Sequence, residues 1–127
     1  MIPLIGVVLM LLGCAGTSHT VVTLDEVANN TAVQLNLDTQ LVVVLDSNPT
    51  TGYMWQLTSV DQNILKHSGN EYEPSPGAPE LTGAGGQETW RFTPLAPGET
   101  TLKMQYVRSW EPNQPAREFI LTVTINP

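Results

Sequence analysis

Apolar and polar residues alternate with a period of two along most of the chain after residue 20. This alternation is typical of strands with one buried face, because successive side chains of a strand point to opposite faces. A continuous run of Leu and Val over residues 41–45 indicates a further strand, either buried on both faces or covered at its ends. No segment carries the apolar stripe of an amphipathic helix. The alternating sets are Val33, Leu35 and Leu37; Tyr53, Trp55 and Leu57; Trp90 and Phe92; Leu102, Met104 and Tyr106; and Phe119, Leu121, Val123 and Ile125.

Together with a weaker strand candidate over residues 64–72, these segments predict seven or eight strands at sandwich-like spacing. The fold class expected is an all-β, immunoglobulin-like β-sandwich. The chain of 127 residues holds one cysteine, so the sandwich has no intersheet disulfide. We therefore expect Trp55, Trp90, Tyr106 and the aliphatic strands to form the core, with Met54 and Met104 as filler.

The N-terminus differs in composition from the rest of the chain. Residues 1–13 carry no charged side chain and are almost wholly apolar, but they are too few to span a bilayer, which takes about 20 residues. They fit the apolar part of an export signal. The residues Leu-Leu-Gly-Cys that end at Cys14 resemble the lipobox of bacterial lipoproteins. The alternative is a buried apolar strand with an ordinary core cysteine.

On the lipoprotein interpretation the chain divides into a signal peptide (1–13), a tether (14–20) and one domain (21–127). Cys14 would carry lipid and anchor the protein in the cell envelope. Ala15 after Cys14 resembles outer-membrane sorting in enteric bacteria, so we expect the domain to face the periplasm or the cell surface.

Composition argues against several classes of function. The formal net charge is −7 and only five residues are Lys or Arg, so nucleic acid is not an expected partner. His19 and His67 form no ligand-spaced pair, which argues against a metal site. Glu71 and Glu73 share one strand face, as in a glycosidase pair, but a solvated acidic edge explains them more simply. We predict no catalytic residue, no metal and no cofactor.

Three loops remain between predicted strands: residues 48–52, 83–86 and 108–112. Asn48 and Pro49 favour a tight turn, and Gly52 can adopt positive φ, so the first loop is held in shape before it meets a partner. Loops at alternate strand junctions gather at one end of a sandwich. Such an edge would present a rigid polar turn, a bare glycine backbone and an indole that suit insertion into a protein groove.

These loops resemble the NPTTG[YF], GxGG and RPW motifs of the chagasin family, inhibitors of papain-like cysteine proteases. The resemblance spans roughly residues 31–125, and its motifs are Asn48-Pro49-Thr50-Thr51-Gly52-Tyr53, Gly83-Ala84-Gly85-Gly86 and Arg108-Ser109-Trp110. It implies a reversible, competitive inhibitor, expected to be monomeric and to act on papain-like, cathepsin L-like enzymes. The alternatives are a non-catalytic envelope interaction module with the same fold and an accessory domain of a secreted enzyme.

Carried over by position, the resemblance assigns a role to each loop. Thr50 and Thr51 would lie nearest the catalytic Cys and His of the protease, in a loop shaped by Asn48, Pro49 and Gly52. Gly85 and Gly86 would approach the non-primed wall of the cleft, while Gly83 and Ala84 help to set the bend. Trp110 would pack on the primed side, with Arg108 holding its loop or meeting an acidic rim. Ser109 departs from the family, which usually has proline there.

Overall fold

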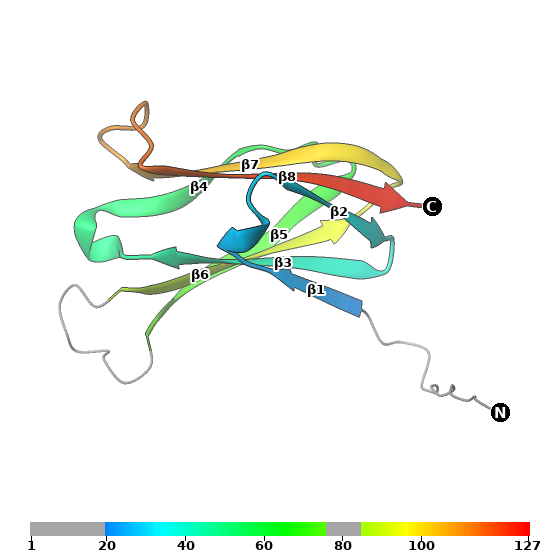
Figure 1. Ribbon diagram of the computed structural model, residues 1–127, viewed down its shortest axis with the longest axis horizontal. Helices are drawn as coiled ribbons and strands as arrows, with labels where there is room; N and C mark the ends of the chain where they lie inside the picture. The colour runs from blue at the N-terminus through cyan, green and yellow to red at the C-terminus, as the bar shows by residue number, and fades with distance from the viewer. Residues whose placement is uncertain (1–19, 76–84) are drawn as a thin grey trace.

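The computed structural model describes residues 20–75 and 85–127, which form eight strands in two stacked sheets (Figure 1). Among these residues no helix is long and apolar enough to cross a membrane. The predicted signal, Cys14 and almost all of the predicted tether lie outside the described residues. The strands are β1 (Thr20–Leu24), β2 (Thr31–Asn36), β3 (Thr39–Ser47), β4 (Tyr53–Ser59), β5 (Leu65–Pro74), β6 (Gly86–Pro94), β7 (Gly98–Arg108) and β8 (Arg117–Asn126), with short 3₁₀ helices η2 (Glu26–Ala28) and η3 (Pro49–Thr51).

The two sheets have the strand orders β1-β3-β6-β5 and β2-β8-β7-β4. β1 runs parallel to β3 and β2 runs parallel to β8, whereas the other neighbouring strands are antiparallel. The prediction of an all-β, immunoglobulin-like sandwich is confirmed. The alternation of residues alone could not predict the parallel pairings of β1 with β3 and of β2 with β8.

The core lies between the sheets and consists of the inward-facing half of each alternating set. Trp55, Trp90 and Tyr106 are only 4%, 5% and 7% exposed, which confirms their predicted place in the core. Met104 is fully buried, but Met54 is 45% exposed, so the prediction that Met54 fills the core was wrong. Met54 adjoins Trp55 on β4 and therefore points to the opposite face of the sheet.

The register of the strands brings the candidate loops to one end of the sandwich. Ser47, the last residue of β3, pairs with Gly86, the first residue of β6. Tyr53, the first residue of β4, pairs with Arg108, the last residue of β7. In Figure 1 the 48–52 turn and the segment after β7 lie at the same end of the molecule, away from the start of β1.

Candidate functional site

The first loop, residues 48–52, is a hydrogen-bonded turn. The Asn48 side chain caps η3, because its Oδ1 accepts hydrogen bonds from Thr50 N (3.2 Å) and Thr50 Oγ1 (2.6 Å). The Asn48 carbonyl accepts from Thr51 N (3.0 Å) and Thr51 Oγ1 (2.7 Å). Pro49 starts η3 with a fixed φ, and Gly52 ends it at φ 89° with its N–H bonded to Pro49 O. The turn is thus shaped by its own residues, while the Thr50 and Thr51 side chains are exposed.

Contacts from the body of the sandwich fix the start of this loop. Tyr106 Oη accepts a hydrogen bond of 2.7 Å from Asn48 N. One residue earlier, the Ser47 hydroxyl donates to the buried Glu88 carboxylate at 2.7 Å. The Asp46 carbonyl accepts from Trp55 Nε1 (3.0 Å) and from the Arg117 guanidinium (3.1 Å). Three consecutive residues before Pro49 are therefore tied to other strands.

The second loop is described only from Gly85 onward, and Gly83 and Ala84 lie outside the described residues. Gly85 has φ 75° and lies beside the first loop, because a Cβ there would approach Ser47 O to 3.3 Å and Asn48 Cβ to 3.5 Å. A Cβ on Gly86 would collide with the Glu73 carbonyl. Close strand packing therefore requires glycine at residue 86, and the left-handed backbone favours it at residue 85.

The third loop places its indole over the first loop. Trp110 is 65% exposed, which confirms the predicted exposure, yet a Cβ added to Gly52 would collide with its ring. Glu111 N donates to Arg108 O at 2.9 Å, so residues 108–111 form a turn. Ser109 occupies the second position of that turn, where proline is favoured. The structure therefore gives a physical reason for the proline of the RPW motif that this loop resembles.

Arg108 joins the two loops through ring contacts. Its guanidinium carbon lies 4.5 Å from the centroid of the Tyr53 ring and 5.8 Å from that of Trp110, and its Nη1 is 3.2 Å from Glu111 Oε1. Tyr53 stacks on Tyr106 with centroids 5.2 Å apart. This arrangement agrees with the expectation that Arg108 holds the Trp110 loop, and it links the exposed indole to the core.

The sequence interpretation missed two polar residues that support the site. Arg117 begins β8, and its guanidinium carbon lies 4.9 Å from the Tyr106 centroid and 5.2 Å from that of Trp55. Glu88 is buried under the first loop. Glu88 precedes Trp90 by two residues, so the alternation that predicts Trp90 as core also points Glu88 inward. Arg117 gave no comparable signal, because its contacts are made across the sheet.

The Thr50 and Thr51 hydroxyls donate hydrogen bonds within the first loop. Among the described residues, no group of three or more His, Cys, Asp or Glu side chains is arranged to hold a metal ion.

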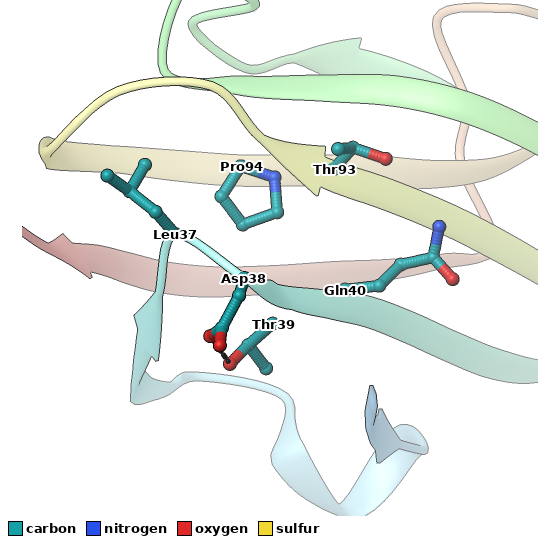
Figure 2. A pocket seen from close by; sticks show the side chains of 6 residues that line it. All are labelled: Leu37, Asp38, Thr39, Gln40, Thr93 and Pro94. Carbon is teal, nitrogen blue, oxygen red and sulfur yellow. Dashed lines mark hydrogen bonds between the residues drawn. The ribbon is translucent and has the colours of Figure 1, made fainter. Parts of the chain in front are cut away.

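A depression of about 510 Å³ lies at the other end of the sandwich, lined by Leu37, Asp38, Thr39, Gln40, Thr93 and Pro94 (Figure 2). It is remote from the three loops, because Thr39 starts the strand that Ser47 ends. The described parts of the three loops lie near one another at the opposite end of the sandwich.

Comparisons with known proteins identify the family. The family model described as chagasin family peptidase inhibitor I42 matches residues 34–125. Amoebiasin-1 of Entamoeba histolytica is 30% identical over 105 residues, which cover 81% of this chain and 98% of amoebiasin-1.

Solved structures support the same fold. The crystal structure of the cysteine protease inhibitor EhICP2 from Entamoeba histolytica matches with a TM-score of 0.74 and 23% identity, covering 87% of this chain and all of EhICP2 (100%). PbICP-C, solved in complex with falcipain-2, matches with a TM-score of 0.57 and 19% identity over 91% of this chain and 96% of PbICP-C. Because the family match extends from β2 to β8, this chain belongs to the chagasin family of peptidase inhibitors and is not an enzyme.

Proposed function

We propose that this protein is a reversible, competitive inhibitor of papain-like cysteine proteases, including cathepsin L-like enzymes, and that its three loops occlude the active-site cleft. Family membership supports inhibition of a peptidase, and the similarity to EhICP2, a cysteine protease inhibitor, suggests the cysteine class. The observation that carries the loop assignment is the packing of Trp110 on Gly52. It makes the first and third loops one continuous surface on which Thr50 and Thr51 are exposed.

In the proposed complex the first loop enters the cleft and Thr50 and Thr51 stand nearest the catalytic Cys and His. Binding needs little ordering of this loop, because its internal hydrogen bonds already fix the turn. The same bonds oppose cleavage. The amides of Thr51 and Gly52 are bonded to Asn48 O and Pro49 O, so a protease could straighten the segment only by breaking them. The loop would therefore block the cleft without being consumed.

The flanking loops would supply the two sides of the interface. Gly85 brings backbone without a side chain beside Asn48, and Gly86 follows it at the start of β6, which suits hydrogen bonding of this segment with a protease backbone. Trp110 offers a large exposed ring, the type of residue that dominates binding energy at protein interfaces. An interface of about 1,600 Å² in total is expected for such a complex.

The proposal extends to the N-terminus and the location of the protein. Residues 1–13 would direct export, and Cys14 would carry lipid that holds a monomeric domain in the cell envelope, through the tether of residues 14–20. Strand register supports a useful orientation, since Thr20 pairs with Thr39 at the end of β3 opposite Ser47. A membrane anchor before Thr20 would thus present the three loops away from the lipid surface.

Titration of residues 15–127 against papain, followed with a fluorogenic peptide, tests the proposal. We expect tight, reversible inhibition that raises the apparent KM of the peptide and leaves kcat unchanged. A folded protein that leaves papain fully active at micromolar concentration would refute the proposal. That result would favour an envelope module that binds another protein through the same sandwich.

A further inference from the structure

We propose that Glu88 is a positioning residue: its buried carboxylate fixes the two ends of the first loop, residues 48–52, in the geometry that fits a protease cleft. The inference rests on the proposed inhibitory function of that loop. Glu88 belongs to β6, it lies outside the three motifs, and it would not touch the protease, because only 2% of its surface is exposed.

The burial of Glu88 requires a specific set of partners. A carboxylate removed from water is strongly unfavourable unless donors surround it. Glu88 Oε2 accepts hydrogen bonds from Ser47 Oγ (2.7 Å) and from Trp55 N (3.1 Å), and its Oε1 accepts from Trp90 Nε1 (3.0 Å). All three contacts are with donors, so both carboxylate oxygens act as acceptors, and an apolar side chain would leave these donors unpaired.

The partners of Oε2 lie on both sides of the first loop. Ser47 immediately precedes Asn48, and Trp55 follows the loop near the start of β4. β3 and β4 belong to different sheets and do not pair with each other. A single oxygen atom of Glu88 therefore joins the strand that enters the loop to the strand that leaves it.

The contacts of Glu88 Oε2 act on the position of the first loop rather than on the packing of the core in general. Two sets of hydrogen bonds hold β3 and β4 together beside the loop: the shared bonding of Ser47 and Trp55 to Glu88 Oε2, and the bond from Trp55 Nε1 to Asp46 O. Of these, only the bonding to Glu88 engages Ser47, the residue directly before the loop. A glutamine at this position has one acceptor oxygen and one donor nitrogen. In Glu88→Gln, either Trp90 or the pair Ser47 and Trp55 must therefore face an N–H₂ group. The substitution keeps the shape of the side chain and disrupts this bonding.

The test compares Glu88→Gln with Thr100→Val in the full chain. Thr100 is also buried, and its Oγ1 accepts from Asp61 N at 2.9 Å, but it lies near the start of β7, at the end of the sandwich opposite the loops. Both variants lose a buried hydrogen-bond acceptor, and urea unfolding measures the stability that each loses. The readouts are the ¹⁵N order parameters of the Thr50 and Thr51 amides in the free protein and the inhibition constant against papain.

We expect Glu88→Gln to lower the order parameters of Thr50 and Thr51 from about 0.85 toward 0.6 or less. We also expect it to raise the inhibition constant at least about tenfold, the effect of losing one charge-assisted hydrogen bond. Thr100→Val should change neither readout at a similar loss of stability. If Glu88→Gln does not fold, Ser47→Ala removes one of the two loop-side donors and should give a smaller change in the same direction.

Unchanged order parameters in Glu88→Gln, or equal effects of Glu88→Gln and Thr100→Val, would overturn the role of Glu88. A wild-type protein that does not inhibit papain would refute the proposed function instead. In that case the order parameters of the free protein would still decide whether Glu88 positions the loop.

Discussion

The indole of Trp110 lies directly on Gly52, so that even one additional carbon on Gly52 would collide with the ring. Gly52 ends the first loop, and Trp110 belongs to a loop more than 50 residues later in the chain. The contact makes each loop a support for the other. Glycine is favoured at residue 52 twice over, by its φ of 89° and by the ring above it.

Replacement of Gly52 by alanine should therefore damage the site more than the fold. Left-handed backbone costs a residue with a Cβ about 1–3 kcal/mol, and the collision must also displace Trp110. We expect a loss of stability in urea unfolding in that range and a larger relative loss of papain inhibition. Gly69→Ala is the matched control, because a Cβ on Gly69 meets nothing within 4 Å. Equal inhibition by the two variants would show that the packing of Trp110 on Gly52 does not matter for inhibition.

Trp110→Ala tests the indole as an anchor. The ring is 65% exposed in the free protein, so its removal should leave the free energy of unfolding nearly unchanged. Inhibition should weaken by about 2 kcal/mol or more, the range of interface hot spots. Leu95→Ala provides a control, since Leu95 is 51% exposed and follows β6 at the end away from the loops. An inhibition constant unchanged by Trp110→Ala would remove Trp110 from the site.

Ser109→Pro should improve the inhibitor. Ser109 occupies the second position of the turn closed by Glu111 N and Arg108 O, and Arg108 ends a strand, which suits a residue before proline. A compatible proline stabilises by about 0.4–1 kcal/mol, which corresponds to about two- to fivefold tighter inhibition if the gain applies to the bound conformation. Weaker inhibition by Ser109→Pro would show that the turn must move on binding.

Asn48→Ala tests whether the turn protects itself from cleavage. It removes the cap that binds Thr50 N and Thr50 Oγ1, a change that costs about 0.5–2 kcal/mol at a helix N-terminus. We expect weaker inhibition and, in mass spectra after long incubation with papain, new cleavage between Thr50 and Thr51. The wild type should stay intact under the same conditions. If the variant resists cleavage as well as the wild type does, the Asn48 cap is not what protects the Thr50–Thr51 bond.

The fold could be predicted from the sequence because burial follows the alternation of residues so closely. The inward positions of β8, from Phe119 to Ile125, are buried as their alternation predicts. Met54 shows the limit of reasoning from residue type alone. Its side chain is apolar, but its position next to Trp55 on an edge strand exposes it.

The loops of the candidate site could be predicted from their motifs, but their supports could not. Asn48, Pro49 and Gly52 act within one short segment, so the turn that they form can be predicted from the sequence. Arg117 reaches Tyr106 only through the pairing of β7 and β8. By residue type alone, Glu88 would be expected on the surface. Its burial can be predicted only from its position two residues before Trp90, which puts both side chains on the same face of β6.

The most direct test of the central claim is the reactivity of papain's active-site thiol toward iodoacetamide in a stoichiometric mixture with this protein. Occlusion of the cleft by residues 48–52 predicts that alkylation slows in proportion to the fraction of papain in the complex, and that Trp110→Ala speeds it again as far as it lowers that fraction. A thiol that reacts at the rate of free papain while the complex is formed would show that the protein binds elsewhere, and would contradict occlusion by the three loops.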